Sequence, residues 1–173
     1  EDPISRKFVQ ALESEIRAAG LATTDSGSAK AAFWSLQPET PFNLTADQAK
    51  LIGSAIGADG YLLVRCVTQR RTSLQRAGYF ESSAAIFVVS SRTGRLVHWS
   101  SRSFDTDSEE GAERALIADA PAAALEVANA IKTTFRSELA AASAHTFPEV
   151  PAEGSPEAQN YRPPAPYNRI RPK

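Results

Sequence analysis

The side chains that most often do chemistry are scarce in this chain of 173 residues. It has two histidines, His98 and His145, and one cysteine, Cys66. Two histidines and a lone cysteine do not make up a zinc ligand set, and no acidic residue stands close to His98 in the sequence. Cys66 lies in an apolar run, which favours a small buried side chain over a reactive thiol. We therefore predict no metal, no cofactor and no catalytic residues, and expect that the chain is not an enzyme.

Two further patterns resemble ligand-binding motifs, but the positions of their residues do not match those motifs. The acidic run at 105–110 would need glycine and glutamate at the sixth and twelfth positions of a calcium loop, but Glu110 and Leu116 stand there. We expect the run to lead into a helix, whose N-terminus favours negative charge. The glycines at 53–60 come before a predicted strand, whereas a dinucleotide loop follows one. Gly57 and Gly60 are therefore expected to end a helix and form a turn.

Arginines crowd the middle of the chain, from 65 to 102. On a sheet with one open face, some of them could form a patch that binds an anionic surface. The alternative is a charged sheet edge that discourages aggregation. Aromatic residues do not alternate with these arginines and the net charge is −1, so no nucleic acid is expected as a partner. Among them we select Arg70, Arg71 and Arg76 as candidate partner-binding residues.

The C-terminal segment has a composition of its own. From residue 143 onwards it holds seven of the 11 prolines and few aliphatic residues, so it has little apolar surface to bury. We predict an α+β globular domain at 1–142 and a proline-rich extended tail at 143–173. Extended proline-rich segments dock on partner surfaces at low entropic cost. The candidate docking residues of the tail are Tyr161, Pro163, Pro164, Tyr167 and Arg169.

Hydrophobic periodicity outlines the elements of the predicted domain. Steps of four from Ile4 to Ile16 predict a first helix, and Thr45 with Gln48 forms a capping box at the start of a second. Residues 61–104 predict a three-stranded antiparallel meander whose second turn contains Gly94. A long helix follows from 119, with an apolar stripe that includes Leu125. These elements predict an α+β fold: a mostly antiparallel sheet with helices packed on one face.

The segment between the first two helices is harder to assign. Residues 21–25 are expected to form a short strand, and residues 31–36 could form another.

No run of apolar residues reaches the length that crosses a membrane. The chain contains no methionine, so a removed signal peptide is one explanation of its first residues, and a trimmed end is the other.

Two short motifs give the chain a resemblance. A helix leads into Gly57, Ala58 and Asp59 before the strand 61–64, and a later hairpin turns at Thr93 and Gly94 before Trp99. This pattern resembles the group of bacterial envelope domains that includes the curli secretion channel (CsgG), the TolB amino-terminal domain and the lipoprotein activators of penicillin-binding proteins. The resemblance covers roughly residues 4–140. It implies a non-enzymatic domain of a bacterial envelope that works by protein contact.

Two functions follow as expectations. The first is an accessory or scaffold subunit of the cell envelope, periplasmic or associated with the outer membrane, which contacts other envelope proteins within a larger complex and uses the tail as a docking arm. The alternative is a periplasmic binding module for a small ligand or a cell-wall fragment, held in a cleft between sheet and helices. Trp34 and Trp99 would be the walls of that cleft.

Overall fold

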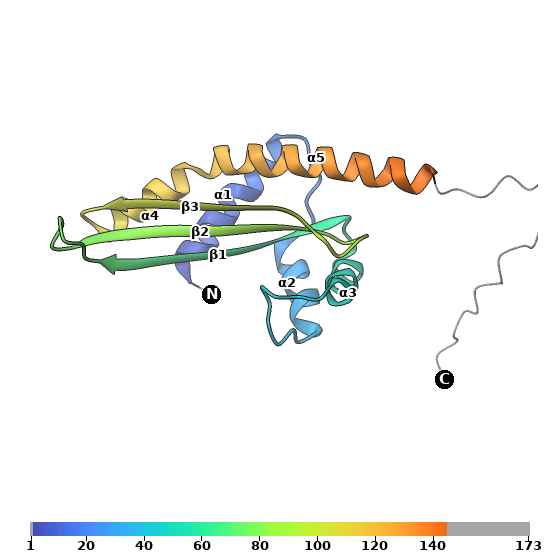
Figure 1. Cartoon of the computed structure of the whole chain (residues 1–173), viewed down its shortest axis with the longest axis horizontal. Helices are drawn as coiled ribbons and strands as arrows, with labels where there is room; N and C mark the ends of the chain where they lie inside the picture. The colour runs from blue at the N-terminus through green and yellow to red at the C-terminus, as the bar shows by residue number, and fades with distance from the viewer. Residues whose placement is uncertain (1, 145–173) are drawn as a thin grey trace, which may run out of the picture. The chain divides into compact units, whose positions relative to one another are not determined.

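The computed structural model describes residues 2–144. The chain divides into two units, Glu1–Arg136 and Ser137–Lys173, which are treated separately. The elements are α1 (Pro3–Ala18), α2 (Ser26–Ser35), α3 (Ala46–Ile56), β1 (Gly60–Arg71), β2 (Tyr79–Ser90), β3 (Leu96–Thr106), α4 (Glu109–Ala118) and α5 (Ala120–Ala144) (Figure 1). In the second unit, the described residues 137–144 are the last turns of α5.

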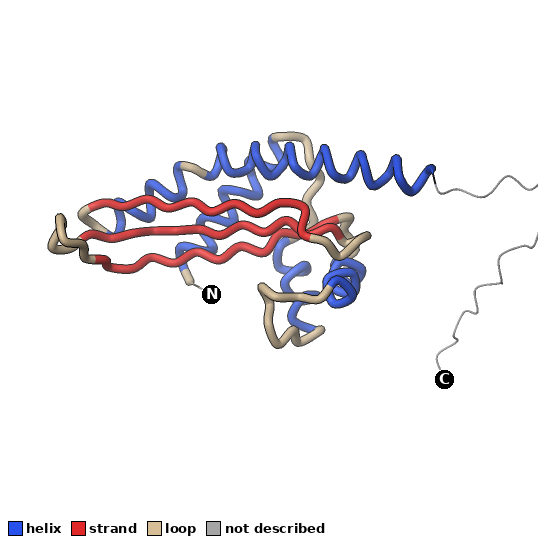
Figure 2. Tube along the Cα trace, viewed as in Figure 1, coloured by secondary structure: helices blue, strands red, loops and turns tan. Residues whose placement is uncertain are grey.

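The three strands form one antiparallel sheet in the order β1-β2-β3, which confirms the predicted meander and the α+β fold class (Figure 2). Ile86 at the middle of β2 is paired with Val64 on one side and with Ser100 on the other. A register shift at Val88 and Val89 places Val89 opposite Leu96. Because strand side chains alternate, this register decides which residues share each face.

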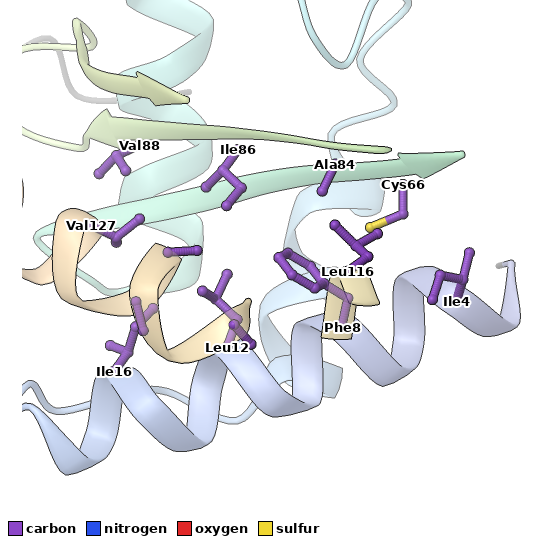
Figure 3. Packing of buried hydrophobic residues seen from close by; sticks show 13 residues of the cluster. Ile4, Phe8, Leu12, Ile16, Cys66, Ala84, Ile86, Val88, Leu116 and Val127 are labelled. Carbon is purple, nitrogen blue, oxygen red and sulfur yellow. The ribbon is translucent and has the colours of Figure 1, made fainter. Parts of the chain in front are cut away.

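One face of the sheet is covered by α1, α4 and α5, which confirms the predicted layer of helices. Its core is a continuous apolar cluster, in which the stripe of α1 meets the even-numbered side chains of β2 (Figure 3). Phe8 is fully buried at its centre, and Leu116 of α4 is buried beside it. The predicted spacing of four residues in α1 is confirmed at Ile4, Phe8, Leu12 and Ile16.

The long helix α5 packs through alanines rather than through its largest apolar side chains. Ala123, Ala124 and Val127 are buried against the sheet, whereas Leu125 is 60 % exposed. The predicted stripe is therefore wrong at Leu125, whereas its member Ala128 is buried and Ile131 packs against the core. Small side chains let the helix backbone lie close to the sheet, so the alanine face of α5 is buried and the face that carries Leu125 is exposed.

The helices α2 and α3 form a second, smaller cluster at one end of the opposite face. Phe33 and Ile52 are buried there against Tyr61 and Val89 of the sheet. The strands expected within 21–36 are absent from the described chain, and α2 occupies Ser26–Ser35 instead. The helix begins where the side chain of Asp25 accepts a hydrogen bond of 2.8 Å from the backbone N–H of Ser28.

Glycines allow α3 to approach the β2–β3 hairpin. A Cβ on Gly53 would lie well inside 3.0 Å of the Ser91 side chain, and one on Gly94 would collide with the backbone of Ala46. Gly57 ends α3 in the left-handed region, at a φ of 73°, as its predicted role requires. The predicted capping box of Thr45 and Gln48 is present at the other end of the helix.

Candidate functional site

The candidate site is the face of the sheet opposite α1, α4 and α5, which we call the open face. It carries the odd-numbered side chains of β1 and β2, together with Leu96, Trp99, Ser101, Ser103 and Asp105 of β3. Its middle is made of small side chains, where Ala85 pairs with Ser101 and Ser83 with Ser103. One end of this face is apolar and the other is charged.

At the apolar end, the loop between α2 and α3 and the sheet enclose a cleft of about 170 Å³. Its wall is mainly apolar, and its lining residues are Pro41, Phe42, Asn43, Leu44, Ala49, Leu63, Phe87, Val89, Gly94 and Leu96. The rings of Phe42 and Phe87 lie 5.7 Å apart between centroids and are tilted by 52°. Phe42 and Leu96 are 45 % and 56 % exposed, so the rim of the cleft is open to solvent.

The two tryptophans predicted as walls of a ligand cleft lie outside the lining of this one. Trp99 is on the open face, directly opposite Phe87, and is 55 % exposed beside the cleft. Trp34 lies on α2, is 57 % exposed and packs edge-on against Phe33 at 5.2 Å. Sequence alone did not single out Phe42, because a phenylalanine in a proline-containing loop carries no periodic signal.

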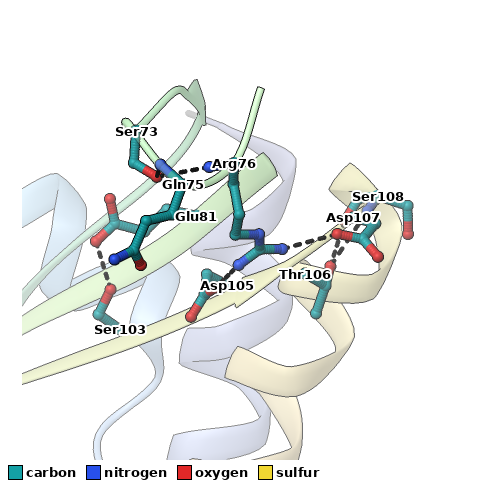
Figure 4. A network of polar contacts seen from close by, with 9 residues as sticks. All are labelled: Ser73, Gln75, Arg76, Glu81, Ser103, Asp105, Thr106, Asp107 and Ser108. Carbon is teal, nitrogen blue, oxygen red and sulfur yellow. Dashed lines mark hydrogen bonds and ion pairs between the residues drawn. The ribbon is translucent and has the colours of Figure 1, made fainter. Parts of the chain in front are cut away.

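At the charged end, Arg76 joins two segments that are distant in the sequence. From the β1–β2 loop its guanidinium donates to Asp105 and, at 2.7 Å, to Asp107 (Figure 4). It also lies 4.7 Å from the centroid of the Tyr79 ring, a cation–π contact. Hydrogen bonds to Asp107 and Asp105 raise the pKa of Arg76 above its usual value. These contacts hold the loop against the β3–α4 connection.

The other two predicted arginines lie at the same end of the sheet. Arg71 donates to Glu81 at 2.7 Å, and the guanidinium of Arg70 lies beside Gly78. Ser103 Oγ donates to Glu81 at 2.6 Å, and this hydrogen bond, followed by that from Arg71, lowers the pKa of the Glu81 carboxyl. The structure therefore places Arg71 and Arg76 at the charged end of the open face with three carboxylates beside them, whereas Arg70, an even-numbered residue of β1, belongs to the covered face. Local charges are balanced, which favours the charged-edge interpretation over a strongly cationic patch.

A second polar cluster lies on the covered face, between β3 and the start of α5. His98 Nε2 is 3.3 Å from Glu126 Oε1, and Arg102 pairs with Glu126 and, at 3.1 Å, with Asp119. The sequence gave no sign of it, because Glu126 stands 28 positions from His98. The cluster is three-quarters buried at Arg102 and Asp119, and it connects α5 to the edge strand of the sheet.

The single cysteine of the chain belongs to the hydrophobic core. Cys66 is a free, buried thiol in the core under α1, as its apolar context predicted. Burial raises its pKa to about 11, so the thiol is protonated at neutral pH. Within residues 2–144, no three histidine, cysteine or carboxylate side chains gather at a metal-binding distance. The same residues contain no helix that is long and apolar enough to cross a membrane.

Comparison of the chain with family models, with curated proteins and with solved structures gives no match. The fold and the open face are thus the observations from which function is argued. The predicted docking residues of the tail lie outside the described residues: Tyr161, Pro163, Pro164, Tyr167 and Arg169.

Proposed function

We propose that the chain is a non-enzymatic accessory or scaffold subunit of a bacterial cell envelope, periplasmic or associated with the outer membrane. The observation that supports contact with other proteins is the apolar end of the open face. Phe42, Leu96 and Trp99 are each about half exposed there. Phe42 and Leu96 line the cleft, and Trp99 lies beside it. Contiguous exposed apolar groups on a folded domain commonly mark interaction surfaces.

The envelope assignment draws its support from the two motifs of the resemblance. In the fold, the two motifs contact each other. Ser91 of the hairpin donates its N–H to Asp59 O at 2.9 Å, and Arg92 lies 3.9 Å from the Asp59 carboxylate. Gly94 of the same hairpin packs on the first turn of α3. The motifs therefore serve a common structural purpose, which is to fix the α3 helix and the cleft at the end of the sheet.

The tail is the second part of the proposal and acts as a docking arm. Deleting residues 145–173 should leave the midpoint of thermal unfolding nearly unchanged, because a proline-rich segment with few aliphatic residues has little apolar surface to bury. The same deletion should weaken recovery of the chain in complexes purified from native membranes. A glycine–serine segment of equal length in place of 145–173 controls for the bulk of the tail. Undiminished co-purification of both variants would remove the tail from the proposal.

A binding module for a small ligand or cell-wall fragment is the second candidate, and the cleft is the observation that favours it. Its volume of about 170 Å³ is small for a drug-sized ligand but large enough for a short acyl chain or a single ring. Trp99, opposite Phe87, is an internal reporter. Titration with cell-wall glycans and lipids should change tryptophan fluorescence if the module binds them, and a Trp34→Phe variant assigns the change to Trp99.

A further inference from the structure

We propose that the apolar cleft binds the proline-rich segment 160–173 of a second copy of the chain. The inference rests on the proposed role of the tail as a docking arm, and it names the partner of that arm. Its structural basis is the cleft itself, where Phe42, Phe87 and Leu96 form an aromatic and aliphatic surface with Pro41 at the lip and Trp99 alongside.

The chemistry of the cleft fits this occupant. Grooves that bind proline-rich peptides are shallow and lined by aromatic rings, because proline rings pack flat on them and the polyproline II backbone has little entropy left to lose. The centroids of Phe42 and Phe87 are 5.7 Å apart, with a tilt that leaves their faces unstacked. Segment 160–173 offers four prolines and two tyrosines in the run NYRPPAPYNRIRPK.

The charge of the lip loop and the length of the arm agree with the assignment. The segment carries four basic side chains and no acidic one. The lip loop, 37–45, has Glu39 as its single charged residue, and Asp47 follows in the first turn of α3 with its side chain 96 % exposed. Lys50 is 3.4 Å from Asp47, so it offsets part of this charge. The 29 residues from His145 to Lys173 could extend about 90 Å as polyproline II, enough to reach a neighbouring molecule.

The test is a mixing experiment on the full chain. A cleft variant, Phe42→Ser, keeps the arm, and an arm variant, Tyr161→Ser with Tyr167→Ser, keeps the cleft. Sedimentation velocity should show that the wild-type chain self-associates. Each variant alone should self-associate with an affinity about tenfold lower, which is the effect of removing a well-packed aromatic anchor. Mixing the two variants should restore one-to-one pairs, because one intact arm then meets one intact cleft.

Controls separate the cleft from general surface effects. Leu74→Ser removes a fully exposed apolar side chain from the β1–β2 loop, at the end of the sheet away from Phe42. This change should leave self-association unchanged. If Phe42→Ser alters the circular dichroism spectrum, Leu96→Ser replaces it, since Leu96 is 56 % exposed on the same rim. A labelled peptide of 160–173 should bind the full chain, and the same peptide with its prolines changed to alanine should bind more weakly.

Three results would overturn the inference. They are a wild-type chain that stays monomeric at every concentration, a Phe42→Ser variant that associates like the wild type, and a mixture that forms no pairs. Peptide binding by a chain that stays monomeric would also exclude a second copy as the source of the arm. Failure here is distinguishable from failure of the proposed function, because the two are measured separately: a wild-type chain that stays monomeric but co-purifies with envelope complexes overturns this inference alone.

Discussion

The contact between the β2–β3 hairpin and α3 can be tested by adding one methyl group at Gly94. This residue has a φ of 68°, and its N–H donates to Ser90 O at 2.8 Å. A Cβ there would lie 2.9 Å from Ala46 Cα and closer still to Ala46 O. For Gly94→Ala, the left-handed backbone costs roughly 1–2 kcal/mol. Overpacking against α3 adds about 1–3 kcal/mol, so the total loss of unfolding free energy should be about 2–5 kcal/mol.

Gly57→Ala is the matched control for this prediction. Gly57 has nearly the same φ, 73°, but a Cβ there would meet no atom within 4 Å. Its loss should therefore be the backbone contribution alone, roughly 1–2 kcal/mol. Urea unfolding followed by circular dichroism measures both variants against the wild type. Equal losses for Gly94→Ala and Gly57→Ala would show that α3 does not pack on the hairpin as described.

Three further predictions concern the core and the charged end of the sheet. Phe8→Ala should lower the free energy of unfolding by about 3–5 kcal/mol, because Phe8 is fully buried, and a loss below that of Gly57→Ala in the same urea assay would contradict its central place in the core. Burial holds the pKa of Cys66 at about 11 against an ordinary 9.0. The unfolded chain therefore releases the thiol proton first, and stability that is complete below pH 9 should fall as the pH rises to 11. Cys66→Ala should lack this part of the pH dependence in unfolding measured from pH 8 to 11, whereas identical slopes would argue against it. Arg76→Ala should leave the thermal midpoint close to that of the wild type, because surface ion pairs contribute little, and protease cleavage in the β1–β2 loop should become faster.

Sequence reasoning succeeded where the local pattern and the tertiary environment agree. The stripe of α1 repeats every four residues, and each of its large apolar members is buried. The capping box at Thr45 is a local hydrogen-bond arrangement, so it needs no tertiary information. The meander was predictable because its turns contain residues that favour turns and its strands are rich in β-branched and aromatic side chains.

It failed where packing overrides local preference. The apolar run that includes Phe33 and Trp34 suits a strand by composition, but it forms α2 because Asp25 caps a helix and Phe33 packs on α3. In α5, the apolar stripe suggested Leu125 as a core position, whereas alanines on the neighbouring face are buried instead. Which face is buried depends on the partner element, which periodicity along one segment does not reveal.

The candidate site was predictable only in part. The sequence selected Trp99 as a wall of a ligand cleft, whereas the structure places it beside the cleft with 55 % of its surface exposed. The pairing of Arg76 with Asp105 and Asp107 spans about 30 positions, and that of His98 with Glu126 spans 28. Contacts between residues so far apart follow from register and helix placement, so they appear only once the fold is known.

The position of β2 in the sheet has a consequence for amide exchange with solvent deuterium. Of the three strands described, β2 alone is hydrogen-bonded on both sides, and its even-numbered side chains are buried in the main core. Amides near Ile86 can then exchange only when the whole domain opens, whereas outward-pointing amides of β1 and β3 exchange through small local fluctuations. The slowest-exchanging amides of the molecule should therefore read out its global stability directly.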